Sequence, residues 1–416
     1  MDMLNGVASG NDDCSTAGEI GPMTASKAAA MASIFPPIKS VKEAYQERRL
    51  YWERYVNEGT RTYSNISMYS ELQPKYRNNS DAKSFPLLCY RVPREGVNVH
   101  LVDPCDAVKT DFLLDGGQYV KFCLHPQFEN AGGEFNDVKP YERLEDEPVA
   151  PRSSSRTLFP FNKEYDIKVH CPVRLSRYNR GIGDKIARHY LETTRALANV
   201  NLPFFAYMAE TLAVIFPAKE GKRSHGFVVR ERDPLPRIAA KPRLLMPCFA
   251  LYSKDKFHPE KRPLVMDLIE MSGMEPLDFI LSKVFYPVIE SWTHIFLTQA
   301  IVIEPHGQNL LLEIGTWRIV LRDFDIHVHE GLRKQLGLPL GEFHPGNLFG
   351  EPTEDRPFGS IPSLYYDKSV GKQFFDYLAP TMQEHYGIPV ELLQEFSSVQ
   401  NSFIAFPLDR FVGIGL

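Results

Sequence analysis

The sequence predicts an α+β fold with antiparallel sheet, and three observations point to it. Short apolar runs separated by Gly and Pro are typical of strands, one long segment has a helical period, and two runs joined across a Gly are typical of a hairpin. Apolar side chains make up 43% and charged side chains 24% of the 416 residues, the balance of a folded globular protein. At ~100–200 residues per domain, this length suggests two or three packed units.

The first part of the chain divides into an arm and an α+β region. Residues 1–37 lack a sustained apolar period and end at a Pro-Pro pair, which predicts a flexible N-terminal arm. The next region, 38–129, is expected to begin with a capped helix over 40–56. Its strands are expected over 87–92, 97–102 and 119–124.

The middle region is expected to span 130–240 and to open with an acidic, aperiodic stretch up to 152. Its strands are expected over 165–175 and 226–232, with a helix over 184–200 between them.

The C-terminal region is expected to span 241–416. After a further strand over 243–253, residues 275–303 have the clearest helical period in the chain, with a kink expected at Pro287. The hairpin follows, with strands expected over 309–314 and 318–321.

Charge and cysteine usage exclude several classes of function. Lys plus Arg number 47 against 52 Asp plus Glu, and a net charge of −5 favours neither nucleic acid nor a membrane surface as a partner. No segment reaches the ~18 uninterrupted apolar residues of a membrane helix. The six cysteines have no metal-finger spacing and are too sparse for a disulfide framework, so we expect them to be reduced and the protein to be cytoplasmic.

A polar loop follows the long helix and precedes the hairpin. Glu304, His306 and Asn309 lie in this loop, and the hairpin ends in Arg322 and Asp323. A carboxylate and an amide oxygen placed side by side in this way would hold Mg²⁺ on a nucleotide phosphate. Alternatively, His306 and Asn309 only satisfy the turn backbone, and Arg322 and Asp323 pair on the surface.

A second polar cluster comes earlier in the chain. Residues 153–157 read Ser-Ser-Ser-Arg-Thr and combine hydroxyls, backbone N–H groups and a guanidinium in one loop. Lys168 follows on the next predicted strand, and three arginines come soon after: Arg174, Arg177 and Arg180. The segment is either a phosphate-binding loop or a solvated linker, and it contains no Walker sequence.

Together the two clusters resemble the IucA/IucC family, the NRPS-independent siderophore (NIS) synthetases. The family's S-x-R-T motif is similar to residues 154–157, its H-G-Q-N motif to 306–309, and its R-D pair to 322–323. The resemblance implies a thumb, fingers and palm architecture, with a palm loosely similar to a protein kinase.

The resemblance also implies roles for individual residues. The nucleotide phosphates would be held by Ser154, Arg156, Thr157 and Lys168. The nucleotide site would also be lined by Gln308 and Asn309. The carboxylate substrate would be held by Ser176, Arg180 and His306. The Mg²⁺ contacts would come from Glu304, Asn309 and Asp323. The residues expected to act in catalysis are Arg156, Lys168, Arg180 and His306.

The function implied is that of a ligase that uses ATP and Mg²⁺. It would adenylate a polycarboxylic acid such as citrate and condense it with an amine or alcohol, in siderophore or related biosynthesis, and it could act as a homodimer. Two alternatives stay open at this point: a kinase-like phosphotransferase, which suits the order of helix, loop, hairpin and Asp, and a catalytically silent ligand-binding protein.

Overall fold

A computed structural model describes residues 50–57, 70–130, 135–171, 173–175, 178–219, 223–238, 244–350 and 377–393. The chain divides into two units, Met1–Pro37 and Ile38–Leu416, and every described residue belongs to the second. The arm expected over 1–37 and most of the helix expected over 40–56 therefore lie outside the described residues. The boundaries expected near 130 and 240 stay predictions.

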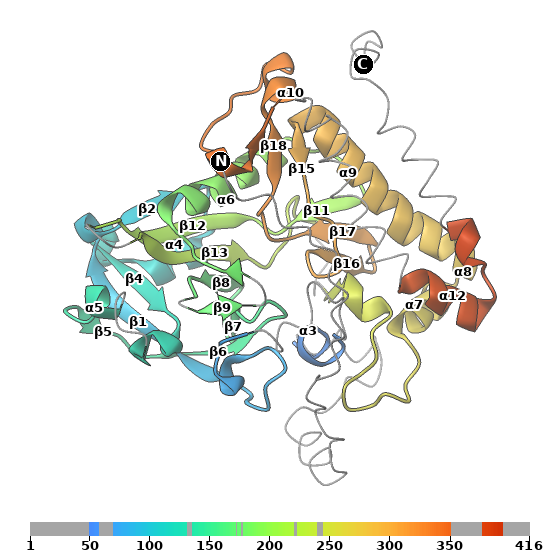
Figure 1. Cartoon of the computed structure of the whole chain (residues 1–416), viewed down its shortest axis with the longest axis horizontal. Coiled ribbons are helices and arrows are strands. Elements are labelled where there is room, and N and C mark those ends of the chain that lie inside the picture. Colours follow the sequence, from blue (N-terminus) through green and yellow to red (C-terminus); the bar gives the residue numbers. More distant parts are fainter. Residues whose placement is uncertain are drawn as a thin grey trace, which may run out of the picture. The chain divides into compact units, whose positions relative to one another are not determined.

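A ten-stranded sheet forms the left-hand side of the view in Figure 1. The strands follow one another in the order β2, β12, β13, β8, β7, β6, β1, β4 and β3, with β5 paired to β1, and all neighbours are antiparallel. In chain order the strands are β1 (Phe85–Pro93), β2 (Asn98–Leu101), β3 (Leu113–Leu114), β4 (Tyr119–Leu124), β5 (Glu142–Arg143), β6 (Glu147–Pro151), β7 (Thr157–Pro160), β8 (Tyr165–Val169), β12 (Glu210–Phe216) and β13 (His225–Glu231). The predicted antiparallel α+β class is confirmed.

The core of this sheet contains a cluster of aromatic side chains. Phe122 on β4 packs edge-on against Phe216 and Phe227, which lie on β12 and β13. All seven residues of β12 are buried, because the strand is paired on both sides and helix α6 (Asp184–Leu197) packs across it. The α6 residues Ala187, Tyr190, Leu191 and Thr194 are buried at helical spacing, which is why this segment forms an amphipathic helix on the sheet.

A smaller sheet contains the predicted hairpin. Strands β16 (Leu310–Ile314) and β17 (Arg318–Leu321) pair across a turn in which Gly315 has a φ of 98°, a conformation that favours glycine. Strand β14 (Leu244–Pro247) joins β16, and β11 (Phe205–Tyr207) runs parallel to β17. The predicted hairpin is confirmed.

The long predicted helix is interrupted. Residues 276–279 form α8 (Pro276–Phe279), a π-helical stretch follows over Ile280–Phe285, and α9 (Tyr286–Gln299) completes it. Pro287 lies in the first turn of α9, and because it has no N–H to donate, the turn before it widens. The helix ends at Ala300, which has a φ of 53°, so residues 301–303 leave the helix for strand β15 (Ile301–Val302).

Two other expected strands are shorter than predicted. The run 165–175 splits into β8 and the two-residue β9 (Arg174–Leu175), which pairs with β10 (Tyr178–Asn179). The run 243–253 stops at Pro247 and turns into a 3-10 helix over Cys248–Leu251. There Phe249 donates its N–H to the Gly307 oxygen at 3.1 Å, and a Cβ on Gly307 would come within 2.9 Å of that nitrogen.

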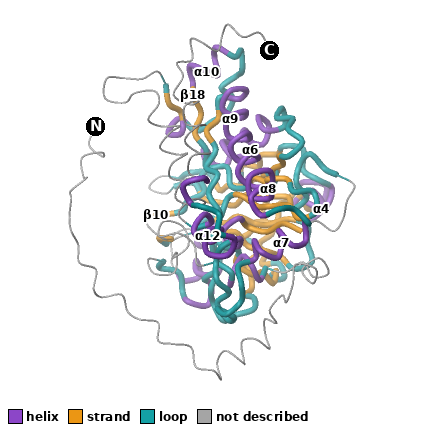
Figure 2. The backbone as a smooth tube through the Cα atoms, turned by 90° about the vertical axis from the view of Figure 1, so that its right-hand side faces the viewer, coloured by secondary structure: helices purple, strands orange, loops and turns teal. Residues whose placement is uncertain are grey.

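The remaining elements are short. Strands β18 (His327–His329) and β19 (Leu348–Phe349) join β15 in a small sheet. The other helices are α3 (Tyr51–Tyr55), α4 (Asp106–Phe112), α5 (Phe135–Val138), α7 (Leu264–Ser272), α10 (Glu330–Gln335) and α12 (Leu378–Tyr386). Helices α7, α8 and α12 lie near one another in both views (Figures 1 and 2). Among the described residues, no helix has the length and apolar character needed to cross a bilayer.

Candidate active site

The serine-rich loop is a fixed turn between β6 and β7. The Ser154 hydroxyl donates to Thr157 Oγ1 at 3.0 Å and accepts the Thr157 N–H at 3.2 Å. Ser155 has a φ of 60° and is fully buried, and its Oγ accepts the Asn78 N–H at 3.0 Å. The interpretation of this segment as a solvated linker is therefore wrong.

The turn leads directly to Arg156 and Lys168. Thr157 and Lys168 are partners across β7 and β8, and the Val169 N–H donates to the Arg156 oxygen at 3.0 Å. The buried Arg156 side chain donates from Nη1 to the Arg180 backbone oxygen at 3.3 Å and hydrogen-bonds with Tyr190 of α6. Arg156, Lys168 and the backbone of Arg180 thus lie together.

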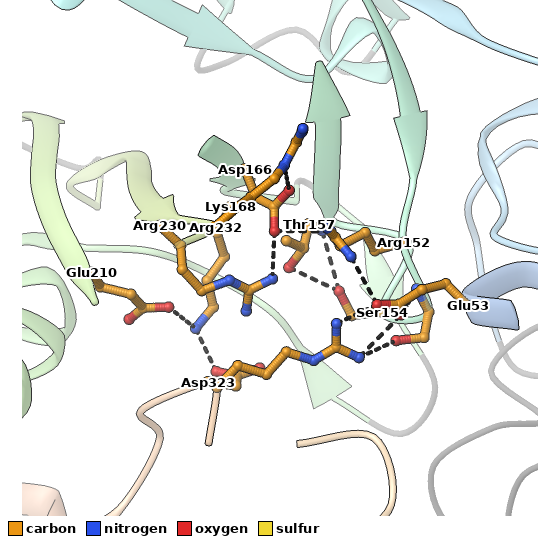
Figure 3. A network of polar contacts seen from close by, with 12 residues as sticks. Glu53, Arg152, Ser154, Thr157, Asp166, Lys168, Glu210, Arg230, Arg232 and Asp323 are labelled. Atoms are coloured by element: carbon orange, nitrogen blue, oxygen red, sulfur yellow. Dashed lines mark hydrogen bonds and ion pairs between the residues drawn. The ribbon is translucent and has the colours of Figure 1, made fainter. Parts of the chain in front are cut away.

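Lys168 is fully buried and is surrounded by opposite charge (Figure 3). Its Nζ lies 3.3 Å from Glu210 Oε1, pairs with the Asp323 carboxylate and stands 3.8 Å from the centroid of the Tyr190 ring. Burial alone would lower the pKa of Lys168, but Asp323 and Glu210 outweigh it and raise this pKa. The side chain therefore stays an ammonium.

Asp323 ends the hairpin, one residue after Arg322, with a φ of 68°. Burial opposes its ionisation, but Lys168 and then Arg156 hold the pKa of this carboxyl well below its usual range. The Arg322 N–H donates to the Asn309 oxygen at 2.9 Å, so Asn309 and Asp323 lie at the same end of the hairpin, as predicted. At this place the carboxylate of Asp323 pairs with the ammonium of Lys168, so its negative charge is already balanced by a cation of the protein.

The turn before the hairpin is organised by His306. Its Nδ1 accepts the N–H groups of Gln308 and Asn309 at 3.2 and 3.3 Å, which fixes the neutral ring with its proton on Nε2. The His306 N–H donates to the Glu304 oxygen at 2.9 Å, and Glu304 is half-buried. His306 thus has the turn-stabilising role that we considered as an alternative, and its role toward substrate stays a prediction.

Arg322 is not part of a surface pair. Both of its terminal nitrogens bind the Glu53 carboxylate of α3, and Nη2 also donates to Ser153 Oγ at 3.2 Å. Arg152 adds a second cation, 2.8 Å from Glu53. Burial alone would raise the pKa of Glu53, but Arg322 and Arg152 lower it to about 2. The alternative of a surface Arg322–Asp323 pair is therefore wrong.

A second buried carboxylate supports the same loop from the sheet. Asp166 on β8 contacts Arg152 at 2.8 Å, Arg230 at 3.0 Å and Arg232 at 2.8 Å. Burial opposes its ionisation, yet these three guanidinium groups keep the pKa of Asp166 well below its usual range. Figure 3 shows how Arg152 connects Asp166 to Glu53, so the serine loop and the hairpin end rest on one continuous network.

For four of the predicted residues, the described geometry assigns no role in the site. Ser176 lies outside the described residues, Gln308 and Arg180 are half-buried, and their roles stay predictions, as does that of Glu304. Three residues were missed by sequence reasoning: Glu53, Tyr190 and Glu210. A signal existed for Glu210, because it is a carboxylate opening the otherwise apolar run Glu-Thr-Leu-Ala-Val-Ile-Phe.

The charges of the site suit a magnesium nucleotide. Among the described residues, no three His, Cys, Asp or Glu side chains form a group that could hold a metal ion by itself. Mg²⁺ commonly takes only one or two protein carboxylates and completes its shell with water and phosphate oxygens. The ionised Asp323 at the hairpin end, with Arg156 and Lys168 next to it, matches this need.

The comparisons with known proteins define the class of fold. No model of a protein family matches the sequence, and no curated protein matches it. Solved structures do match, and they give the chain the fold of the IucA/IucC-type synthetases, which confirms the predicted fold class. The division into thumb, fingers and palm stays a prediction.

Three of these structures are a petrobactin biosynthesis protein and two aerobactin synthetases. Petrobactin biosynthesis protein AsbB from Bacillus anthracis has a TM-score of 0.66 and 19% identity, over 89% of this chain and 71% of that chain. Aerobactin synthetase IucC from Klebsiella pneumoniae has a TM-score of 0.60 and 16% identity, over 84% of this chain and 68% of that chain. ATP-bound aerobactin synthetase IucA from the same organism has a TM-score of 0.62 and 16% identity, over 80% of this chain and 65% of that chain.

Proposed function

We propose that this chain is an ATP- and Mg²⁺-dependent ligase of siderophore or related natural-product biosynthesis. It adenylates a carboxylic acid, a polycarboxylate such as citrate, and condenses it with an amine or alcohol. The observation that carries the proposal is the meeting of Arg156 and Lys168 with Asp323, because the two cations come from the large sheet and the carboxylate from the hairpin of a fold shared with siderophore synthetases.

The chemistry needs cations more than a nucleophile. A carboxylate oxygen of the acid bonds to the α-phosphorus of ATP, the bond to the bridging oxygen breaks, and pyrophosphate leaves. The amine or alcohol then bonds to the acyl carbon, loses its proton, and AMP leaves. Both reactants of the first step are anions, so positioned cations lower their repulsion and stabilise the charge of the transition state.

Each predicted residue has a part in this scheme. Ser154, Arg156, Thr157 and Lys168 bind the phosphates, and Gln308 and Asn309 line the nucleotide site. Ser176, Arg180 and His306 bind the acid, and His306 presents Nε2–H as a donor because its Nδ1 is used by the turn. Glu304, Asn309 and Asp323 would hold the metal, and Mg²⁺ would supply positive charge against the phosphates.

The remaining properties follow the same proposal. The partners are a small carboxylic acid and an amine or alcohol, and the enzyme works in the cytoplasm, alone or as a homodimer. The five described cysteines are free, which suits a reducing compartment.

One experiment tests the proposal and its two rivals. The protein is incubated with ATP, Mg²⁺ and a panel of carboxylic acids, with and without an amine such as a diamine or ω-amino alcohol, and products are read by mass spectrometry. Acid-dependent release of AMP and pyrophosphate supports the ligase. Release of ADP with a phosphorylated product would show a phosphotransferase, and no turnover with retained ATP binding would show a silent binding protein.

A further inference from the structure

Two carboxylates contact the one ammonium of Lys168, and their surroundings differ. Glu210 lies 3.3 Å from Lys168 Nζ, and Asp323 pairs with the same nitrogen from the other side (Figure 3). The Tyr190 ring, 3.8 Å from Nζ, forms a third contact. None of the predicted roles accounts for Glu210 or Tyr190.

Glu210 is fixed in place by the fold. It is fully buried at the start of β12, its N–H donates to Thr194 Oγ1 at 3.0 Å, and its backbone oxygen accepts from the same hydroxyl at 3.0 Å. Its Oε2 has no hydrogen-bond partner among the described residues. Burial and these backbone bonds keep Glu210 inside the sheet, and its carboxylate has acceptor capacity left for Lys168.

Asp323 has the freedom that Glu210 lacks. It stands beyond the end of β17, and its side chain is 18% exposed, whereas the side chains of Glu210 and Lys168 are fully buried. Asp323 also follows Arg322, whose N–H donates to the Asn309 oxygen at the hairpin end. Of the two carboxylates, only Asp323 can turn away from the lysine toward another cation.

We infer that Glu210 and Tyr190 are positioning residues that hold Lys168 in every state of the site, whereas Asp323 is an exchangeable partner that gives Lys168 up to a nucleotide phosphate. This inference rests on the proposed function. In the state described, Asp323 and a phosphate compete for one ammonium, and a divalent cation that engages Asp323 removes the competitor. The exchange thereby makes nucleotide binding depend on the metal.

The exchange predicts opposite effects for the two carboxylates. Asp323→Asn removes the competitor, so ATP without metal should bind about tenfold more tightly, and Mg²⁺ should no longer strengthen binding. Glu210→Gln leaves Asp323 as the only counterion of Lys168, so their pair tightens. ATP without metal should then bind about tenfold more weakly, while Mg²⁺ still strengthens binding.

The test is calorimetric titration of ATP, in EDTA and in excess Mg²⁺, into wild type, D323N and E210Q. The control makes the same two substitutions in a Lys168→Met background. There the changes in ATP affinity measured in EDTA should fall below about twofold, because the shared ammonium is gone. If E210Q does not fold, Glu210→Asp, which keeps the charge but draws it away from Lys168, replaces it with the same expectation.

Two results would overturn the inference. If E210Q bound ATP more tightly without metal, Glu210 would be a second competitor of the phosphate for Lys168. If the changes in ATP affinity persisted in the Lys168→Met background, neither carboxylate would act through Lys168. A wild-type protein that binds no ATP in either buffer would instead remove the proposed function, and this inference with it.

Discussion

Glu53 is the residue on which the hairpin end and the serine loop both depend. It pairs with Arg322 and Arg152, and Glu53→Gln would leave the buried Arg322 without its counter-charge and Arg152 with Asp166 alone, at a cost of ~3–5 kcal/mol in the free energy of unfolding. Urea unfolding at neutral pH measures this loss. An E53Q protein within about 1 kcal/mol of wild type would contradict the described network.

The pH dependence of stability gives an independent check on Glu53. The pKa of Glu53 falls from 4.5 to about 2 on folding. Its contribution to the free energy of unfolding is therefore fully present above pH 4.5 and is lost as the pH falls through 2. This shift corresponds to about 3 kcal/mol. Wild type should therefore lose more stability than E53Q between pH 5 and 2, and equal losses in urea titrations would contradict the assignment.

Arg156 is assigned to the nucleotide phosphates. Arg156→Gln should weaken binding of MgATP by roughly tenfold to a hundredfold, the value of one charge-assisted bidentate contact. Arg174→Gln is the matched control, because its side chain is 52% exposed and belongs to the same run of arginines. Calorimetry that finds equal affinities for R156Q and R174Q would contradict the phosphate assignment.

Arg180 is assigned to the acid, not to ATP. Arg180→Lys keeps the charge but loses the planar fork that matches a carboxylate, so the apparent affinity for the acid should fall about tenfold while MgATP binds as in wild type. The KM for the acid and the Kd for MgATP measure the two separately. Equal weakening of both would contradict this division of roles.

At the scale of elements, Thr194 connects α6 to β12. Its hydroxyl exchanges hydrogen bonds with the Glu210 backbone at 3.0 Å, so Thr194→Val should strand a buried N–H and cost ~1–3 kcal/mol. Thr194→Ser, which keeps the hydroxyl, is the matched control and should cost less. Similar urea midpoints for the two variants would show that this bond does not hold Glu210.

Periodicity predicted the elements whose signal is local. Helix α6 begins at Asp184 as expected, β4 has the predicted ends, and the hairpin falls where the Gly-separated runs put it. The π-helical turn before Pro287 and the early end of the strand at Pro247 were missed. Both depend on backbone geometry around a proline, which a hydrophobic pattern does not contain.

The site shows the same division between local and distant information. The loop residues Ser154 to Thr157 and the hairpin residue Asp323 were found because each belongs to a short motif. Their supports, Glu53 and Glu210, were missed because neither belongs to a local motif: Glu210 reaches Lys168 across 42 positions, and Glu53 reaches Arg322 across 269. A single sequence holds no record of such pairings.

At the scale of the whole molecule, the candidate site joins distant parts of the chain. Lys168 of the ten-stranded sheet pairs with Asp323 at the end of the hairpin. Glu53 of α3 pairs with Arg322 at the hairpin end and with Arg152 beside the serine loop. Separating any of these segments would leave buried charges without partners. We therefore expect the described part of the chain to unfold around the site as one unit.

The most direct test of the central claim is the identity of the nucleotide product. With ATP, Mg²⁺ and a polycarboxylic acid such as citrate, we expect acid-dependent formation of AMP and pyrophosphate, and incorporation of labelled pyrophosphate into ATP when the amine is omitted. Asp323→Asn should abolish both. Formation of ADP in place of AMP, or wild-type exchange by D323N, would contradict it.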